Sequence, residues 1–372
     1  MRLLDRYLLR ELLLPLVYTV GGFLLFWVVF EIFGQLSVLQ EKRLTFNEVT
    51  LYYLVRIPEL LVTVLPISLL LALLYSLTNH ARHHELTAMR AAGVGLWRIC
   101  LPYLFVGLFF SGVLFLLAEI FVPKSLAKSR DILNSHTPED KEKTKVRQNV
   151  YFRNAKENRI WAIGSYNLES LEMLGVNIEW KLESGVVRRL IAKRANYKNE
   201  QWTFFDLQQF TYEPSVDLEK AALPTRTNQL SIAELTETPT DIAVILKFNS
   251  LTGVEAAKKP HLTIDELQYL RSHLQLNTKD KAVLETQWQA RLAQPWTCMV
   301  VVLVTIPFGA ASGRRNVFVG VAMSIFICFA YFILMRISLA LGTGGYLDPF
   351  LAGWLPNLIF GGTGLCLTQL TR

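Results

Sequence analysis

Six long stretches of the sequence carry almost no charged residues, and they limit what this chain can fold into. A helix needs about 20 mostly apolar residues to cross roughly 30 Å of hydrocarbon, and each stretch meets this length. The stretches cover residues 12–33, 51–77, 99–121, 292–313, 316–340 and 349–371. Their order predicts an α-helical multi-pass membrane protein, with three transmembrane helices before a polar block and three after it.

The charged residues are concentrated in that polar block. Between positions 124 and 291 lie 25 of the 38 Lys and Arg residues and 22 of the 31 Asp and Glu residues. The charged fraction of the whole chain, 19%, is therefore an average over a nearly uncharged membrane part and a soluble insert. The insert is expected to fold without a disulfide, because the cysteines fall within or beside the uncharged stretches, at Cys100, Cys298, Cys328 and Cys366.

The short loops predict the orientation, because Lys and Arg are enriched on the cytoplasmic side of a membrane. With the N-terminus inside, the cytoplasmic segments hold nine basic and three acidic residues, whereas the short outer loops are balanced. We therefore predict that both termini are cytoplasmic and that the polar block lies outside the cytoplasm. The first uncharged stretch is too long for a cleaved signal peptide, so we expect it to remain as the first span.

Residues 149–213 show short β-rich runs separated by turn residues, which is typical of an antiparallel meander. The predicted strands are 150–152, 159–163, 176–182, 186–192 and 202–212. A sheet of this kind needs cover for its apolar face, which predicts a partial sandwich or an open jelly roll. Its interior is either a closed core or a lipid-binding groove lined by aromatics such as Trp180 and Phe204. After the strands, a capping box at 263–266 predicts a helix.

The segment between the second and third spans predicts a short cytoplasmic helix. Residues 85–92 are mostly good helix formers, and Gly93 is a suitable C-terminal cap. Leu86 and Met89 share one helical face, and we expect this loop to have nothing of its own chain to cover. The segment is therefore predicted to bind a cytoplasmic partner, with Glu85 making a charged contact.

Taken in order, these features resemble the LptF/LptG permease family, the transmembrane subunits of the lipopolysaccharide exporter in Gram-negative inner membranes. The resemblance rests on Asp5, Arg6 and Tyr7 with Arg10 and Glu11, RIPELLVTVLP (56–66), ELTAMRAAGVG (85–95), Glu119 and Pro123, ETQWQARLAQP (285–295), Pro307, and GWLPNLIF (353–360). The strand signals are slightly closer to the G type than to the F type.

With this resemblance the chain divides into four parts. Residues 1–123 hold transmembrane helices 1–3 with a coupling helix at about 83–95, and residues 124–260 form a periplasmic β jelly-roll-like domain. Residues 261–291 form a connecting helical segment, and residues 292–372 hold transmembrane helices 4–6.

The resemblance implies a transport subunit and not an enzyme. Two such permeases would pair on a dimeric cytoplasmic ABC ATPase, contacted by the coupling-helix residues Glu85, Leu86, Met89 and Arg90. The sequence has no glycine-rich loop ending in Gly-Lys-Ser or Gly-Lys-Thr, so ATP and Mg²⁺ are expected on the ATPase and no cofactor in this chain. The jelly roll would stack on periplasmic jelly-roll bridge proteins and pass lipopolysaccharide acyl chains along its interior. No nucleic acid partner is implied.

Isolated charges in the membrane part are candidates for substrate contacts, because such charges are costly to keep there. A guanidinium near the outer end of the fifth span is expected to hold a phosphate of the glycolipid. Its alternatives are pairing with Glu31 or Glu119, or extension to the interface. Glu31 departs from the family, one branch of which has basic residues in this part of span one. The candidate substrate-binding set is Arg336, Lys42, Arg43 and Glu31.

Two other functions stay open on the sequence alone. An ion-coupled secondary transporter would show inverted repeats and several mid-membrane ionisable residues. Here the two sets of three spans are only weakly alike, and Arg336 is the one candidate for a deep charge. A membrane-anchored periplasmic scaffold or enzyme would need a site in the insert, but its histidines have no second ligand at metal-binding spacing. Elsewhere, we expect Arg56 and Glu59 to form an interfacial ion pair, and His83 and His84 to be solvated.

Overall fold

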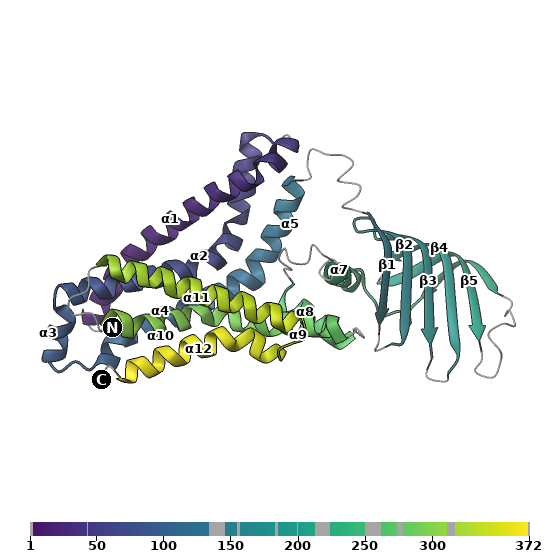
Figure 1. Ribbon diagram of the computed structural model, residues 1–372. Helices are drawn as coiled ribbons and strands as arrows, with labels where there is room; N and C mark the ends of the chain where they lie inside the picture. Colours follow the sequence, from purple (N-terminus) through teal and green to yellow (C-terminus); the bar gives the residue numbers. More distant parts are fainter. Residues whose placement is uncertain are drawn as a thin grey trace. The chain divides into compact units, whose positions relative to one another are not determined.

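The computed structural model describes residues 3–42, 44–133, 146–154, 157–182, 185–198, 200–212, 224–249, 262–273, 278–310 and 317–370. The chain forms two compact units. One unit comprises Met1–Leu133 and Ala282–Arg372, and the other comprises Asn134–Lys281. The first is helical and the second contains a β-sheet (Figure 1).

The described residues include six helical segments that are long and apolar enough to cross a membrane, which confirms the six predicted spans. The first three spans and the short helix between them are formed by α1 (Leu3–Glu41), α2 (Phe46–Arg82), α3 (Glu85–Ala91), α4 (Leu96–Leu116), the π-helical turn η1 (Leu117–Phe121) and α5 (Val122–Leu133). The last three are formed by α9 (Thr278–Ala293), the 3₁₀ turn η3 (Gln294–Trp296), α10 (Thr297–Ala310), α11 (Val317–Thr343) and α12 (Pro349–Leu370).

Most of these helices extend beyond the uncharged stretches. The helix α1 begins nine residues before the predicted start at position 12, because charged residues such as Arg6 and Arg10 end an apolar run without ending a helix. Prolines also lie inside five of the helical segments, for example Pro58 and Pro66 in α2. Neighbouring helices and local adjustments tolerate such prolines in membrane proteins.

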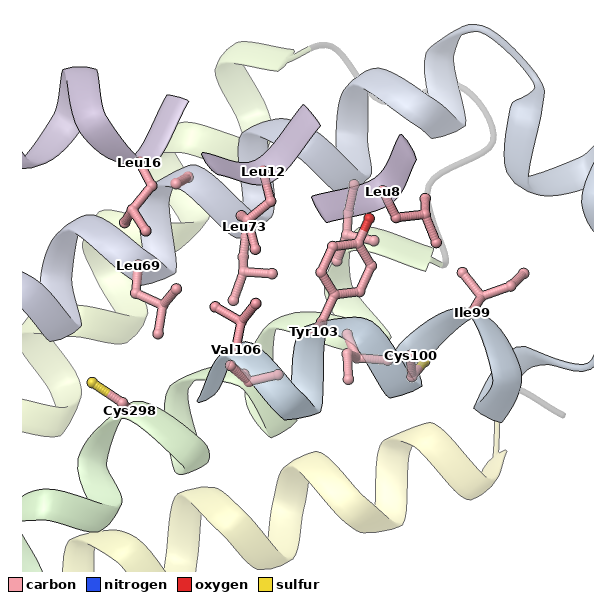
Figure 2. Packing of buried hydrophobic residues seen from close by; sticks show 14 of the residues in the cluster. Leu8, Leu12, Leu16, Leu69, Leu73, Ile99, Cys100, Tyr103, Val106 and Cys298 are labelled. Atoms are coloured by element: carbon pink, nitrogen blue, oxygen red, sulfur yellow. The ribbon is translucent and has the colours of Figure 1, made fainter. Parts of the chain in front are cut away.

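The core of the helical unit lies where α1, α2, α4 and α10 meet (Figure 2). Leu8, Leu12 and Leu16 recur every four residues and therefore share one face of α1. Figure 2 shows this face directed toward Leu69 and Leu73 of α2. The opposite side of α1 exposes large apolar side chains, which suits contact with lipid or with another membrane helix.

Two glycines allow α12 to approach its neighbours at backbone contact. A Cβ atom added at Gly353 would lie 2.8 Å from the backbone of Gln289, and one added at Gly364 would lie 2.7 Å from the backbone of Leu303. Any side chain at these positions would push the helices apart. Small residues are the usual means by which membrane helices pack this closely.

The second unit contains one six-stranded antiparallel sheet, which confirms the predicted meander. The strands follow chain order, so each pairs with the next (Figure 1). They are β1 (Val146–Asn154), β2 (Arg159–Asn167), β3 (Glu172–Lys181), β4 (Val187–Lys198), β5 (Gln201–Tyr212) and β6 (Thr225–Ile232). An open sheet of this kind fits a jelly-roll-like domain.

Sequence reasoning missed two elements of this unit and found a third. Strand β6 is mostly exposed and polar, so it lacks the apolar alternation that marks a half-buried strand. Helix α7 (Pro239–Asn249) lies between the last predicted strand and the predicted capping box, where no regular element was predicted. Helix α8 (Ile264–His273) begins as predicted, because Thr263 and Glu266 form the reciprocal hydrogen bonds of a capping box, at 3.0 and 3.2 Å.

A buried ion pair holds the segment before α7 against the sheet. Nη1 of Arg159 donates to Oε2 of Glu237 at 2.8 Å, and the two side chains are 2% and 1% exposed. Asn154 donates to the other carboxylate oxygen at 2.9 Å, and Trp202 donates to the Glu237 backbone carbonyl at 2.6 Å. The Arg159 guanidinium lies 4.4 Å from the centre of the Trp180 ring.

Candidate functional site at the start of helix α3

Helix α3 lies in a tight connection between two membrane spans. His84 adopts a left-handed backbone, with φ of 60°, between the end of α2 and the start of α3. Gly93 also has a positive φ, 83°, and the amide of Val94 donates to the Met89 carbonyl at 3.0 Å. This geometry closes the helix end, as predicted for Gly93. Figure 1 shows α3 at the same end of the helical unit as the start of α1 and the end of α12.

Glu85, the first residue of α3, contacts the first two spans. The Tyr7 hydroxyl of α1 lies 3.0 Å from Oε2 and 3.2 Å from Oε1 of Glu85. Nδ1 of His80, in the last turn of α2, lies 2.7 Å from Oε2. The Glu85 side chain is 32% exposed. The carboxylate is therefore held by its own chain and still reaches solvent.

The remaining residues of α3 separate into an inner and an outer face. Leu86 is 6% exposed and belongs to the core cluster, against which Met89 also packs. The expectation that this apolar face has nothing of its own chain to cover is therefore wrong, because the face covers one end of the helical core. The exposed side of α3 consists of Thr87, Ala88, Arg90 and Ala91.

A second contact ties α1 to the start of α4. Nη2 of Arg98 lies 2.9 Å from Oδ1 and 3.0 Å from Oδ2 of Asp5. Asp5 and Tyr7 belong to the same turn of α1. Through Tyr7 and Asp5, the first turns of α1 therefore bind both ends of the connection that contains α3.

Near the other end of α1 lies a charged network inside the membrane part. Nη1 of Arg56 lies 2.6 Å from Oε1 of Glu31, and Nη2 lies 2.9 Å from Oε2 of Glu59. The Tyr52 hydroxyl accepts a third hydrogen bond from Arg56 at 2.9 Å. The predicted pair of Arg56 and Glu59 is thus present, and both side chains are buried within the protein. Local spacing predicts the pair, whereas Glu31 joins it only through the packing of α1 on α2.

Arg336, the candidate for a phosphate contact, does not join this network. Arg336 lies on the exposed side of α11 and makes no hydrogen bond or ion pair with the described residues. Its pairing with Glu31 is not seen, because Glu31 pairs with Arg56 instead. Lys42 lies in the turn after α1, and Arg43 lies outside the described residues.

Trp180 and Phe204 both lie on the buried face of the sheet. Trp180 is 8% exposed and Phe204 is fully buried. The guanidinium of Arg188 lies 5.8 Å from the centre of the Trp180 ring, on which Arg159 also stacks. Within the described part of this unit, both side chains are therefore packed against neighbouring residues and do not line an open groove at these two positions.

Within the described residues, no group of three or more His, Cys, Asp or Glu could hold a metal ion. A family model described as lipopolysaccharide export system permease LptF/LptG matches residues 6–369. The chain belongs to this family. The comparison with curated proteins gave no match.

Family membership fixes the general role of the LptF/LptG chain. It is a multi-pass inner-membrane permease for lipopolysaccharide export and a transport subunit of the Lpt complex, in which permeases pair. The match covers both types together, so it does not separate G from F.

The site also contains two residues that sequence reasoning missed. His80 lies five positions before Glu85 in the polar run 78–84 that follows the second apolar stretch, where no pattern distinguishes it from His83 and His84. Tyr7 carries no signal either, because 78 residues separate it from Glu85. His83 and His84 are exposed, as predicted.

Proposed function

We propose that this chain is one permease of an ATP-driven lipopolysaccharide exporter, and that a dimeric cytoplasmic ABC ATPase binds it at α3. The observation that carries the proposal is the partly exposed Glu85 carboxylate beside the exposed side of α3. Arg90 lies on that exposed side and would be part of the same contact. ATP and Mg²⁺ would be bound by the ATPase, and this chain would hold no cofactor.

Movement of α3 would be transmitted to the spans by its inner contacts. Leu86 and Met89 pack into the core formed by α1, α2, α4 and α10, and packed interiors transmit displacement because they deform little. Glu85 binds Tyr7 of α1 and His80 of α2 directly. A displacement of α3 by the ATPase would therefore move the membrane spans that α3 contacts.

Lipopolysaccharide would enter between spans one and five of this permease and those of its partner permease. Both α1 and α11 expose apolar side chains that suit acyl chains or a partner helix. Arg336, exposed on α11, would hold a phosphate bidentately. Lys42 would add a second positive charge near the end of α1, followed by Arg43.

The β domain would receive the extracted lipid and pass it to periplasmic jelly-roll bridge proteins. Among the described strands the sheet is open, with β1 and β6 at its two edges, which suits stacking of one jelly roll on another. Acyl chains would follow the buried face that contains Trp180 and Phe204, and entry would require the packing there to open.

The test is to purify the chain with everything that binds it and to identify proteins and lipids by mass spectrometry. We expect a second permease, an ABC ATPase and lipopolysaccharide. Glu85→Ala should reduce ATPase co-purification or lower the lipid exported per ATP hydrolysed. Glu41→Ala, which removes an exposed carboxylate at the far end of α1, is the matched control. Unchanged assembly and unchanged coupling in Glu85→Ala would exclude the proposed contact.

A further inference from the structure

Glu85 is held by two side chains that come from outside α3. Tyr7 and His80 come from different spans, yet both contact the same carboxylate, and their rings lie 5.7 Å apart. An ionised carboxylate can only accept hydrogen bonds, so the hydroxyl of Tyr7 and Nδ1 of His80 are the donors. Two donors on one carboxylate fix the direction in which its free lone pairs point.

The side chain of His80 is buried where it meets Glu85. It is 1% exposed, and among the described residues its Nε2 has no hydrogen-bond partner. Nδ1 carries the proton that faces the Glu85 oxygen, because an ionised carboxylate can only accept a hydrogen bond. His80 therefore acts as a directed donor to Glu85.

The carboxylate keeps capacity for an external cation. A carboxylate offers about four lone-pair sites, and the Tyr7 hydroxyl and His80 together make three contacts with the Glu85 oxygens. With 32% of the Glu85 side chain exposed, a cationic side chain of the ATPase can bind without displacing either donor.

We infer that Tyr7 and His80 are positioning residues that set the geometry of Glu85 for the ATPase and tie it to spans one and two. This inference rests on the proposed function, because it requires that Glu85 contact the ATPase. It assigns the two side chains a role beyond fold stability. A movement of span one would shift Glu85 through Tyr7, and a movement of span two would shift it through His80.

The test uses the complete transporter in proteoliposomes, with the ATPase titrated onto the permeases and lipid release measured per ATP. Tyr7→Phe keeps the ring and removes only the donor, and we expect a roughly three- to tenfold weaker ATPase affinity with lower coupling, as for the loss of one typical hydrogen bond. His80→Leu should act similarly, and His80→Asn should restore function because its amide places a donor near the position of Nδ1. Tyr18→Phe, on the exposed side of α1, is the matched control.

A double-variant comparison separates positioning from general damage. If Tyr7 acts through Glu85, Tyr7→Phe should add nothing to Glu85→Ala, whereas an independent role would add its full effect. Additive effects, or wild-type affinity and coupling in both Tyr7→Phe and His80→Leu, would overturn the inference alone. Wild-type behaviour of Glu85→Ala itself would instead overturn the proposed function.

Discussion

Replacing Glu237 by Gln should destabilise the β domain strongly, because it removes the buried counter-ion of Arg159 and leaves only the partly exposed Glu157, whose Oε2 lies 3.2 Å from Nη2 of Arg159. Arg159 is 2% exposed and Glu237 is 1% exposed, so water cannot substitute for the lost carboxylate. The new amide would also place a donor near the donors of Arg159 or Asn154. Removing one partner of a buried ion pair costs about 3–5 kcal/mol. That corresponds to a roughly 10²- to 4 × 10³-fold more frequent opening of the domain.

Hydrogen exchange of the full chain in detergent, followed by mass spectrometry, measures this opening in peptides from β2 and β5. The double variant Arg159→Met with Glu237→Leu removes both charges and should lie within about 1–2 kcal/mol of the wild type, since apolar replacement of a buried pair is often neutral. Asp206→Asn is the control, because its pair with Lys193 is 58% and 83% exposed and should contribute less than about 1 kcal/mol. A change below about tenfold in the single variant, or equal damage in the double variant, would refute the reasoning.

Two further predictions concern the membrane part. Gly364→Ala should lower the thermal-unfolding midpoint of the purified chain, because its Cβ would lie 2.7 Å from the Leu303 backbone and overpacking costs about 1–3 kcal/mol. Gly362→Ala has no atom within 4 Å of the new Cβ and should leave the midpoint unchanged, so equal shifts in both would contradict the packing argument. Arg336→Gln should reduce lipopolysaccharide bound to the purified complex by about tenfold, as expected for a lost charge-assisted contact to phosphate. Equal lipid in the variant and the wild type, measured by mass spectrometry, would exclude Arg336 from the binding site.

The fold class could be predicted because it depends on local patterns. Membrane spans follow from apolar length, and the meander follows from alternating runs with turns between them. Strand β6 was not predicted because its residues are mostly exposed and polar and show no apolar alternation. These residues form a strand because they pair with β5. The predicted spans were shorter than the observed helices for a related reason. An apolar window ends at the first charged residues, whereas the helix continues through them.

The candidate site was predictable only in part. Glu85 and the helix that follows it could be found from the sequence, but the direction of its apolar face could not. That face was expected to bind a partner protein, but it covers the core. Leu86 packs against helices whose arrangement cannot be inferred from the sequence.

The sequence by itself determined which segments cross the membrane, which segment forms the sheet and where isolated charges remain. The tertiary structure decided which of those charges meet. Glu31 pairs with Arg56 across 25 positions, Glu85 binds Tyr7 across 78, and Asp5 binds Arg98 across 93. Periodicity fixes the face of a helix on which a residue lies, but the rotation and depth at which two helices pack fix its partner. The residues that we propose to couple this permease to its ATPase are therefore defined by packing.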